Sequence, residues 1–427
     1  MRVNLLIRDF VERVVGGRRP PTTWTRPRSR RRRALFVCSP IGLGHVRRDL
    51  AIADELRLLR PDLEIDWLTQ DPVTRVLAER GERVHPASRW LASESAHFEA
   101  EAGEHDLHAF QALRRMDEIM VANFHVFHDL VAEQAYDLWA VDEGWEIDQF
   151  LFDNPELKRA PYVWLADFVG VQPMPDGGPA ESVLAADFNA ERVERQRRHP
   201  RLRDRSIFVG NPGDLVSAPL GPGLPTVREF ARERYSFAGY VSGCTPPTDR
   251  AALRAELGYR PDERVCLVTV GGSGVGGALL RRVAAAFPAA ARRVPGLRMV
   301  AVAGPRIDPA SVAAPDQVEV RGYLPELHRH LAACDLAVVQ GGLTTTMELV
   351  AARRPFVYVP LEHHFEQQIH VPQRLAQYRA GRRLAYADTD PDRLADAIAT
   401  EIDSPVDYRP VETDGAARAA TLIAQLV

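Results

Sequence analysis

The chain has 427 residues and a formal net charge of −4; 45% of its residues are hydrophobic and 26% are charged. This composition is typical of a folded globular protein, and it excludes a disordered chain, a coiled coil and a collagen-like repeat. The length predicts two or three domains, no apolar run is long enough to span a membrane, and the net charge excludes the strong positive field of a nucleic-acid-binding protein.

Residues 1–33 form a basic leader, with eleven arginines against two acidic residues and with apolar side chains at helical spacing over residues 3–15. Charges within this stretch and the lack of a small-residue cleavage site argue against a signal peptide. An amphipathic helix followed by a basic run can lie on an anionic membrane, which predicts a peripheral protein at the inner face of the membrane. The alternative is a disordered extension. No nucleic acid partner is expected, because no aromatic stacking platform accompanies the arginines.

The four cysteines lie far apart, and no pair has the spacing of a zinc or redox motif. They are Cys38, Cys244, Cys266 and Cys334. Three of them sit in or beside apolar runs, where cysteine behaves as a small hydrophobic residue. We therefore expect reduced, structural thiols in a cytoplasmic protein.

From residue 34 the chain alternates short apolar runs with segments of helical periodicity. The strands predicted in the first half are Ala34–Ser39, Glu64–Leu68, Leu138–Asp142, Tyr162–Ala166 and Ile207–Val209. A helix is predicted over Asp49–Leu59 and a long helical stretch over 95–134. Short apolar strands separated by helices indicate a parallel sheet that is covered on both faces.

The same alternation restarts after a turn-rich segment at 211–247. The strands predicted there are Val265–Val270, Met299–Ala303, Val318–Val320, Leu336–Val339 and Phe356–Val359. We therefore predict an α/β protein with two doubly wound, Rossmann-like domains. The predicted division is a leader at 1–33, an N-terminal domain at 34–240, a C-terminal domain at 241–403 and a C-terminal helix within 404–427.

Ligands of such sheets bind at the carboxyl ends of the strands, so the residues that follow each strand are candidate site residues. After the first strand comes a glycine-rich turn that includes Gly42 and Gly44 and ends at His45, where a helix is predicted to begin. A helix N-terminus favours a neutral histidine, the state that a general base needs. The alternative is that His45 only caps its own helix.

Three further segments follow strands of the second half. Residues 271–278 hold five glycines and Ser273, and their exposed N–H groups next to a helix N-terminus would attract a diphosphate. In residues 340–348, Thr344 and Thr345 precede a helix, where they could also be simple caps, and Glu348 could accept both hydroxyls of a ribose. Residues 360–368 are rich in polar groups that suit a hydroxylated ligand.

These four segments, in this order and in two α/β halves, resemble the GT-B glycosyltransferases, and above all the bacterial UDP-N-acetylglucosamine transferase branch of the lipid I to lipid II type. The resemblance covers residues 34–403 and is strongest around 40–56 and over 335–375. It implies two domains facing across a cleft, a C-terminal helix that crosses back, and no cofactor or metal. It also implies a nucleotide-diphosphate sugar donor, with uridine as the base, bound by the C-terminal half, and an acceptor held by the N-terminal half.

The resemblance implies a role for individual residues of the donor site. By position, the expected donor-binding residues are Gly44, Ser273, Gly274, Tyr323, Leu324, Thr344, Thr345, Glu348, Glu366, Gln367 and Gln368. Among them, Ser273, Gly274 and the threonines would hold phosphate, the 321–324 segment would read the base through its backbone, Glu348 would bind the ribose, and the two glutamines would contact the sugar. Gln340 and Thr344 depart from the wider family, which has histidine and asparagine at these positions.

The implied reaction is an attack of an acceptor hydroxyl on the anomeric carbon while the nucleotide diphosphate leaves. His45 aligns with the histidine that some members use as the base, and Asp142 is the candidate that orients it, with Glu143 equally available. The Asp388-Thr389-Asp390 segment is predicted to cap a helix over 391–402 and not to bind a metal. His125 and His128 share a helix face, and a solvated or acceptor-facing pair is expected there in place of a metal site.

Two other functions remain open from the sequence. A sugar-nucleotide epimerase or hydrolase of the same fold would need no acceptor. A non-catalytic scaffold would bind a nucleotide or a glycan without turnover. The acceptor itself is open between a small molecule and a lipid-linked sugar.

Overall fold

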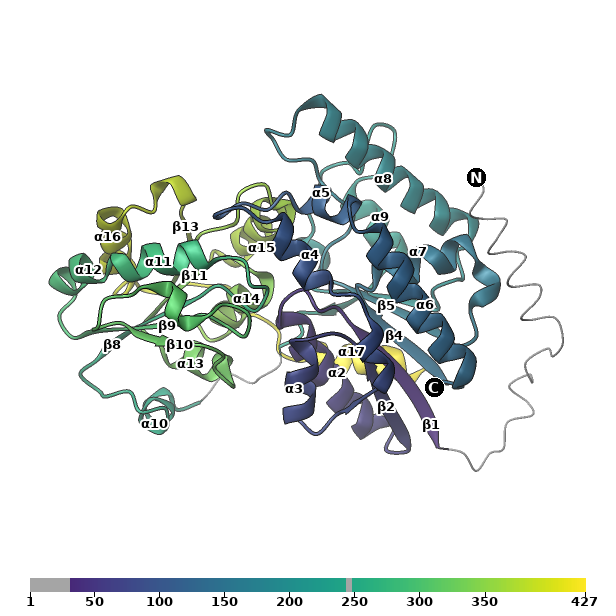
Figure 1. Cartoon of the computed structure of the whole chain (residues 1–427), viewed down its shortest axis with the longest axis horizontal. Helices are drawn as coiled ribbons and strands as arrows, with labels where there is room; N and C mark the ends of the chain where they lie inside the picture. The colour runs from purple at the N-terminus through teal and green to yellow at the C-terminus, as the bar shows by residue number, and fades with distance from the viewer. Residues whose placement is uncertain (1–30, 243–247) are drawn as a thin grey trace.

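A computed structural model describes residues 31–242 and 248–427 of the chain. They form two lobes, each built on a parallel sheet (Figure 1). The N-terminal sheet has the strand order β3-β2-β1-β4-β5-β6-β7 and the C-terminal sheet the order β10-β9-β8-β11-β12-β13. In each sheet the chain winds outward in both directions from the first long strand, which is the doubly wound arrangement. The predicted fold class is therefore confirmed.

The strands of the first sheet are β1 (Arg32–Cys38), β2 (Leu63–Leu68), β3 (Arg83–Val84), β4 (Leu138–Asp142), β5 (Tyr162–Ala166), β6 (Arg205–Val209) and β7 (Ser236–Gly239). Those of the second sheet are β8 (Arg264–Thr269), β9 (Leu297–Val302), β10 (Glu319–Arg321), β11 (Leu336–Val339), β12 (Phe356–Tyr358) and β13 (Arg382–Arg383). The ten predicted strands all exist, with ends that differ by at most two residues. The strands that were not predicted, β3, β7 and β13, are the short ones at the sheet edges.

The helices of the N-terminal lobe are α2 (Gly44–Leu59), α3 (Val73–Glu79), α4 (Glu94–Glu101), α5 (Ala109–Arg114), α6 (Asp117–Glu133), α7 (Trp145–Asp153), α8 (Gly178–Arg198) and α9 (Val227–Arg234). Those that follow are α10 (Arg250–Glu256), α11 (Gly277–Ala285), α12 (Phe287–Arg293), α13 (Leu327–Ala333), α14 (Leu343–Ala351), α15 (Val371–Tyr378), α16 (Pro391–Glu401) and α17 (Gly415–Ala424). They cover both faces of the sheets, which explains why the central strands are apolar throughout.

The prediction of one long helical stretch over 95–134 is wrong in one respect, because the structure divides this stretch into α4, α5 and α6. The segment between α4 and α5 pairs with the other lobe. The Leu107 N–H donates to the Glu362 carbonyl at 3.0 Å, and the Glu362 N–H donates to the His105 carbonyl at 3.0 Å. Backbone groups that bond across the lobes cannot continue a helix, so the helix ends there.

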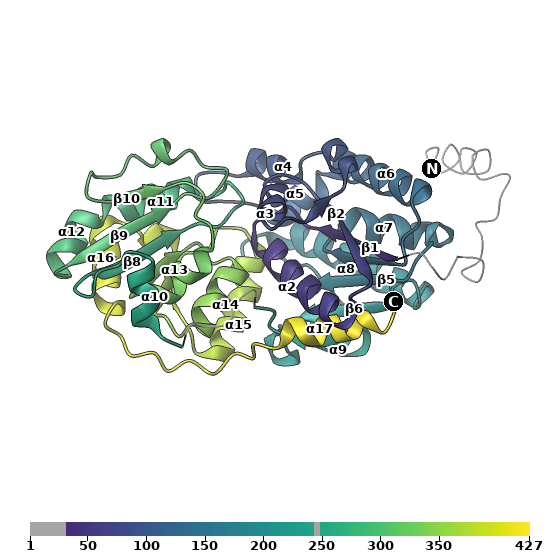
Figure 2. The same cartoon turned by 90° about the horizontal axis from the view of Figure 1, so that it is seen from below.

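The C-terminal helix α17 leaves the C-terminal lobe and packs beside α2 on the N-terminal lobe (Figures 1 and 2). Its buried side chains Ala416, Ala419, Ala420 and Ile423 belong to the same core cluster as strand β1 and helix α2. The predicted crossing back of this helix is confirmed.

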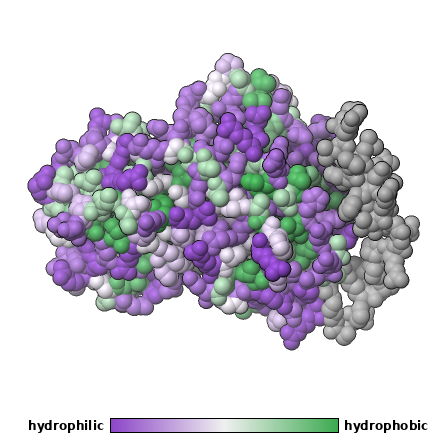
Figure 3. Space-filling view, viewed as in Figure 1, coloured by the Kyte–Doolittle hydropathy of each residue, from purple (hydrophilic) through white to green (hydrophobic). Residues whose placement is uncertain are grey.

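The membrane prediction for 1–33 rests on residues that lie almost wholly outside the described part of the chain, and Cys244 also lies outside it. Cys38, Cys266 and Cys334 are buried and unpaired, as expected. Among the helices within 31–242 and 248–427, none has the length and apolar content that crossing a membrane requires. Hydrophilic residues cover most of the face shown in Figure 3.

Candidate functional site

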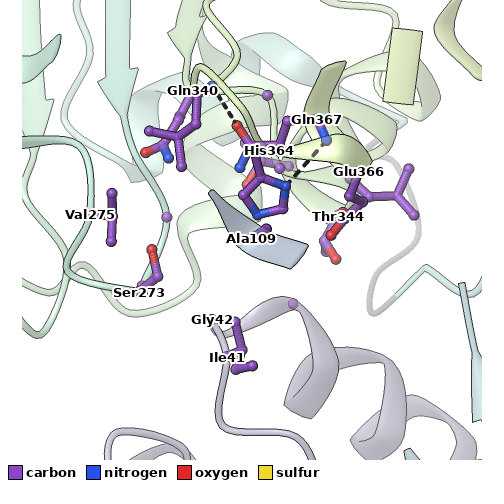
Figure 4. Close-up of a pocket in the computed structure, with 18 of the residues that line it drawn as sticks. Ile41, Gly42, Ala109, Ser273, Val275, Gln340, Thr344, His364, Glu366 and Gln367 are labelled. Carbon is purple, nitrogen blue, oxygen red and sulfur yellow. Dashed lines mark hydrogen bonds between the residues drawn. The ribbon is translucent and has the colours of Figure 1, made fainter. Parts of the chain in front are cut away.

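A cleft of about 1220 Å³ lies between the two lobes and is lined by both. The N-terminal lobe contributes the turn after β1, including Ile41, Gly42 and His45, and the C-terminal lobe contributes the segments after β8, β11 and β12. In Figure 4, Ile41 and Gly42 lie on one side of the cleft, and Ser273, His364 and Thr344 lie on the side of the C-terminal lobe. The carboxyl ends of both sheets therefore open into one space, as expected for this arrangement.

His45 lies in the first turn of α2, and its side chain contacts the end of strand β4. The His45 Nδ1 and Asp142 Oδ2 atoms are 3.0 Å apart, and Asp142 is fully buried. Leu43 is the N-cap position of α2 and the cap has no side-chain hydrogen bond, so His45 does not cap its own helix. Helix α2 begins at Gly44, one residue before the predicted helix start at His45, and includes the whole helical segment predicted over Asp49–Leu59. Asp142, and not Glu143, is the carboxylate that contacts His45.

Arg48, one turn further along α2, joins two buried carboxylates. Its Nε atom donates to Asp142 Oδ2 at 2.8 Å, and its terminal nitrogens contact Asp142 Oδ1 and Asp167 Oδ2. Burial by itself would raise the pKa of Asp142, but Arg48 and His45 outweigh burial and hold that pKa at about 2. Asp142 is therefore a carboxylate at neutral pH, and it can accept a hydrogen bond from the imidazole of His45.

Two other carboxyl groups beside this network are kept neutral. Burial and Asp167 raise the pKa of Glu143 well above its ordinary value, and burial and Asp142 do the same for Asp49. The Glu143 side chain accepts a hydrogen bond from the Asp167 N–H at 3.0 Å. Asp142 and Asp167 thus share Arg48, and Arg48 NH2 also lies 3.6 Å from Glu143 Oε1.

The glycine-rich segment after β8 enters the cleft with Ser273 but not with every predicted residue. Ser273 lines the cleft. Gly274 faces Glu99 of the other lobe so closely that an added Cβ would lie 1.9 Å from Glu99 Oε1. Glu99 is itself paired with Arg306, whose NH2 group lies 2.9 Å from Oε2. The amide of Gln340, oriented to satisfy its hydrogen bonds, donates to the carbonyls of Val270 and Val275 and so shapes this segment.

Helix α14 places three predicted donor residues along a second hollow of about 470 Å³ that continues from the cleft. Thr344, Thr345 and Glu348 line it together with Tyr323 and Leu324. Glu348 lies in the second turn of α14, which begins at Leu343.

The carboxylate of Glu348 receives one polar contact from the opposite lobe. Arg47 NH1 of α2 lies 3.4 Å from Glu348 Oε1, and Glu348 is 6% exposed. Burial raises the pKa of Glu348 while Arg47 acts against that rise. A ligand hydroxyl at Glu348 would therefore share the carboxylate with Arg47 or displace it.

The polar segment after β12 is only partly directed into the cleft. His364, Glu366 and Gln367 line the cleft, whereas Gln368 does not. Burial lowers the pKa of His364 to about 4, and burial together with Asp167 raises the pKa of Glu366 to about 8, so both groups are neutral at pH 7.

The two glutamine side chains are engaged by the protein itself. Gln367 accepts from the Leu361 N–H at 2.9 Å, and Gln368 donates to the Leu361 carbonyl at 2.7 Å and contacts Arg383. Figure 4 shows the backbone of Gln367 bonded to His364, whose ring points into the cleft.

The lobes approach each other most closely at the two glycine-rich turns. A Cβ added at Gly44 would lie 2.2 Å from the Thr344 hydroxyl, and one added at Gly272 would lie 2.7 Å from the Leu43 side chain. Gly44 therefore lies directly beside a predicted phosphate contact. Its lack of a side chain lets the α2 and α14 N-termini meet.

Two groups of side chains have the spacing of metal ligands within the described residues. One is Cys38, Asp49 and Asp142, where the Arg48 cation already occupies the carboxylate of Asp142. The other is Asp106, His108 and His363 at the lobe interface. Asp390 caps α16 by accepting from the N–H groups of residues 392 and 393, as predicted. His125 and His128 belong to neither group.

Sequence reasoning missed Arg47, Arg48, Asp167 and His364. Asp167 directly follows strand β5, so applying the strand-end rule to every strand would have found it. The two arginines stand next to His45 in the sequence, but only the fold shows that one pairs within its lobe and the other across the cleft. His364 lies in a segment that was singled out for its polarity.

The chain is similar along most of its length to solved glycosyltransferases. CalG4, the calicheamicin glycosyltransferase, aligns over 93% of this chain and 94% of its own with a TM-score of 0.54 and 19% identity. The spinosyn rhamnosyltransferase SpnG, solved with thymidine diphosphate, aligns over 92% of this chain and 95% of its own with a TM-score of 0.55 and 18% identity. These likenesses define the fold as GT-B, the two-lobed glycosyltransferase fold.

The second half of the chain matches a known domain family. Residues 265–426 match the glycosyltransferase family 28 C-terminal domain. Over 233 residues the chain is 29% identical to the UDP-N-acetylglucosamine–N-acetylmuramyl-(pentapeptide) pyrophosphoryl-undecaprenol N-acetylglucosamine transferase of Carboxydothermus hydrogenoformans, covering 53% of this chain and 56% of that protein. The protein of that name from Mycolicibacterium smegmatis is 39% identical over 121 residues, 26% of this chain and 30% of its own. The chain thus carries a family 28 C-terminal domain and spans about half the length, or less, of these curated relatives.

Proposed function

We propose that the protein is a glycosyltransferase that moves a sugar from a uridine-diphosphate donor to an acceptor hydroxyl, without a metal ion and with inversion at the anomeric carbon. The observation that carries this proposal is the juxtaposition in one cleft of the His45–Asp142 pair with the glycine-rich segment and the start of α14. A candidate base on one lobe thereby shares a cleft with a glycine-rich segment of the other lobe, whose N–H groups would bind a diphosphate.

The hollow that continues from the cleft supports a nucleotide donor. Glu348, Tyr323 and Leu324 line it at positions where a ribose and a base would follow the diphosphate. Uridine is favoured because the curated relatives are named as UDP-N-acetylglucosamine transferases, although one of the similar structures holds thymidine diphosphate. Helices α11 and α14 begin just after two of the segments that line the cleft, and the dipoles of their N-termini would offset the charge of a diphosphate bound there in place of a metal ion.

In the proposed mechanism, Asp142 holds the imidazole of His45 as the Nδ1–H tautomer. The carboxylate at 3.0 Å favours a proton on Nδ1, whereas the Arg48 guanidinium, 2.9 Å from the same nitrogen, favours a bare Nδ1. The proposal gives the carboxylate the deciding role, which leaves Nε2 free to take the proton of the acceptor hydroxyl. Arg48 fixes the Asp142 carboxylate by two nitrogens and keeps it ionised. The neutral His364 and Glu366 border the space where the sugar would lie.

The names of similar proteins indicate two possible classes of acceptor. Curated relatives are named for a lipid-linked, pyrophosphoryl-undecaprenol acceptor, and the structural neighbours for natural products such as calicheamicin and spinosyn. A lipid-linked acceptor would bring the protein to the inner face of the membrane, where the basic leader would assist. A small-molecule acceptor would need no membrane contact.

A thermal-shift panel of nucleoside diphosphates and their sugars tests the donor. Stabilisation by UDP and its sugars above other nucleotides is expected, because only a ligand that binds the folded state raises the melting temperature. No stabilisation by any nucleotide would refute the proposal. Sugar release or epimerisation without an acceptor would favour the epimerase or hydrolase, and binding without any turnover would favour the scaffold.

Glu348→Gln should weaken UDP binding by about 10-fold or more, since a hydrogen bond to a charged group contributes roughly 1.5–3 kcal/mol. Isothermal titration calorimetry with UDP, and with ribose 5-phosphate as a ligand that has no base, measures the change in affinity. Glu256→Gln, at an exposed position of α10 in the same lobe, is the control and should leave both affinities unchanged. Equal affinity of Glu348→Gln and the unaltered protein for every nucleotide would remove Glu348 from the site.

A further inference from the structure

A second cavity, with about 1140 Å³ of empty space including its open mouth, lies in the N-terminal lobe beside the cleft. The helices around it are α5, α6, α7 and α8, which lie in one lobe in Figure 1. Leu113, Trp145 and Phe168 line both this cavity and the cleft, so the two spaces are adjacent. A molecule that fills the cavity and extends past these side chains would reach the cleft that His45 lines.

The wall of the cavity is aromatic. Trp145, Phe152, Phe168 and Phe188 all line it. Trp145 packs edge-on against Trp164 of strand β5, with ring centroids 5.1 Å apart, which fixes the position of its ring. Rigid rings in a cavity of this size suit a flat apolar body more than a highly hydroxylated one.

Arg192 is a cation of this cavity that makes no hydrogen bond among the described residues. Its guanidinium lies 4.0 Å from the ring centre of Trp145 and 5.2 Å from that of Phe188, and its side chain is 21% exposed. Its nearest carboxylate, Asp148, lies 4.0 Å away. Among the described residues, no oxygen accepts a hydrogen bond from it.

Of the other charged groups of the cavity, Asp148 and Arg195 are already paired, whereas the exposed Asp117 makes no ion pair among the described residues. Asp148 receives two hydrogen bonds from Arg203, at 2.7 and 2.5 Å, and one from the Tyr162 hydroxyl at 2.9 Å. Arg195 is bound by Asp153 at 3.1 Å and by Glu191 at 2.7 Å.

Arg192 is therefore a partly buried cation whose nearest anion, Asp148, is already bound by Arg203. Burial and the neighbouring Arg203 cation lower the pKa of Arg192 to about 10, against the effect of Asp148. A buried cation is unfavourable unless an anion pairs with it. Its planar fork of N–H groups suits a carboxylate, a sulfonate or a phosphate.

We infer, on the basis of the proposed glycosyltransferase function, that this cavity binds the acceptor and selects one with a flat ring body and an anionic group. The rings hold the body and Arg192 pairs with the anion. The hydroxyl to be glycosylated would then extend past Phe168 into the cleft. Arg192 is a specificity-determining residue in this view, and it takes no part in proton transfer.

Two dyes with the same skeleton test the site directly. 8-Anilinonaphthalene-1-sulfonate carries a sulfonate, and N-phenyl-1-naphthylamine lacks it. Fluorescence titration should show that Arg192→Gln weakens binding of the sulfonate about 10–100-fold while the affinity for the neutral dye changes less than about threefold. Arg195→Gln is the matched control, because Arg195 lines the same cavity but is paired, and it should leave both affinities nearly unchanged.

Equal losses of both dyes, or no loss of the sulfonate, would overturn the inference, because Arg192 would then act only by packing on Trp145. Displacement of the sulfonate by UDP would also overturn it, because the dye would then occupy the donor site. Arg192→Lys, which keeps the charge, should retain most of the sulfonate affinity and guards against misfolding of the glutamine variant. Competition with 1-naphthoate, an anion on flat rings, and with farnesyl phosphate, an anion on a lipid chain, shows which kind of anion the cavity prefers. Stronger displacement of the sulfonate dye by farnesyl phosphate would refute the inference that the acceptor has a flat ring body.

The titrations need neither donor nor turnover, so their failure and the failure of the proposed function are distinguishable. If no nucleotide stabilises the protein in the thermal-shift panel, the proposed glycosyltransferase function is refuted, and the inference of an anion site at Arg192 is unaffected. A normal UDP response with an unchanged sulfonate affinity in Arg192→Gln would refute the anion site alone.

Discussion

At the scale of single residues, the cleft depends on which carboxyl groups carry a charge. Asp142 stays ionised because Arg48 pairs with it, whereas Asp49, Glu143 and Glu366 are held neutral by burial and by neighbouring carboxylates. One ionised group next to His45 is what a positioned base requires, since further negative charge would strengthen its hold on the proton.

His45→Ala should lower kcat by about 10²–10⁴ while the affinity for UDP barely changes, because the base acts in the transition state and lies on the lobe opposite the donor hollow. Steady-state kinetics paired with UDP calorimetry measures both quantities. His125→Ala, at an exposed position of α6, is the control. Full activity of His45→Ala would exclude His45 as the base.

Asp49→Asn should flatten the dependence of stability on pH. Asp49 is 1% exposed, neither of its carboxyl oxygens has a hydrogen-bond partner, and its pKa is raised by burial and Asp142. A raised folded-state pKa means that the folded protein binds the proton more tightly, so stability falls as pH rises above the ordinary value near 4. Removing this group should reduce that slope by up to about 1.4 kcal/mol per pH unit.

Urea unfolding of both proteins between pH 5 and pH 8 measures the slope. The unaltered protein should lose more free energy of unfolding over this range than Asp49→Asn does. Identical slopes would mean that Asp49 is ionised in the folded state.

At the scale of elements, the start of α2 serves both lobes. Its first two turns carry His45 and Arg48 toward β4 and β5, and Arg47 toward Glu348 of α14. The absence of a side chain at Gly44 brings the two helix N-termini together at Thr344. The turn after β1 therefore sets both the position of the base and the closure of the cleft.

Gly44→Ala should reduce activity at least 10-fold without preventing folding, because the new methyl group would clash with the short, branched Thr344 side chain and hold the lobes apart. Activity assays and circular dichroism measure the two effects. Gly213→Ala is the matched control, since a Cβ there meets no atom within 4 Å. Unchanged kinetics in Gly44→Ala would show that the closed contact is dispensable.

The elements also show how far sequence reasoning reaches. The bounds of β4, β5 and β11 were predicted correctly, because buried parallel strands are short apolar runs between turn residues. The strand-end rule placed Asp142 and Glu143 near His45, and only the structure shows that Asp142 is the one in contact with it. By contrast, the break between α4 and α5 and the Arg47–Glu348 contact depend on the opposite lobe, which local periodicity does not report.

At the scale of the whole molecule, His363 links the lobes through two carboxylates of the N-terminal lobe. Its Nδ1 lies 2.7 Å from Asp106 Oδ1 and its Nε2 lies 2.9 Å from Asp176 Oδ2, with the ring of His108 stacked on it at 4.1 Å. A neutral imidazole has only one N–H, so both bonds form only in the protonated ring. Burial lowers the pKa of His363, but Asp106 and Asp176 outweigh burial and raise it.

The stability that His363 adds should therefore be complete below its unfolded-state pKa and disappear as pH rises through the raised folded-state value. We expect the melting temperature of the unaltered protein to exceed that of His363→Asn most at pH 6 and least near pH 9. Asparagine is chosen because it tolerates the positive φ of 56° at this position. A constant difference across this range, or an equal effect of His125→Asn, would show that the ring is not protonated here.

The return of α17 gives the chain a second crossing between the lobes, and the two crossings touch. A Cβ added at Gly415 would lie 2.1 Å from the carbonyl oxygen of Tyr240, so the outgoing and incoming segments run side by side. Two lobes that are connected at neighbouring points rotate about a hinge at those points more easily than they slide apart. We therefore expect the cleft to open by a hinge rotation, and a protease cut in either connecting segment would leave the other one intact.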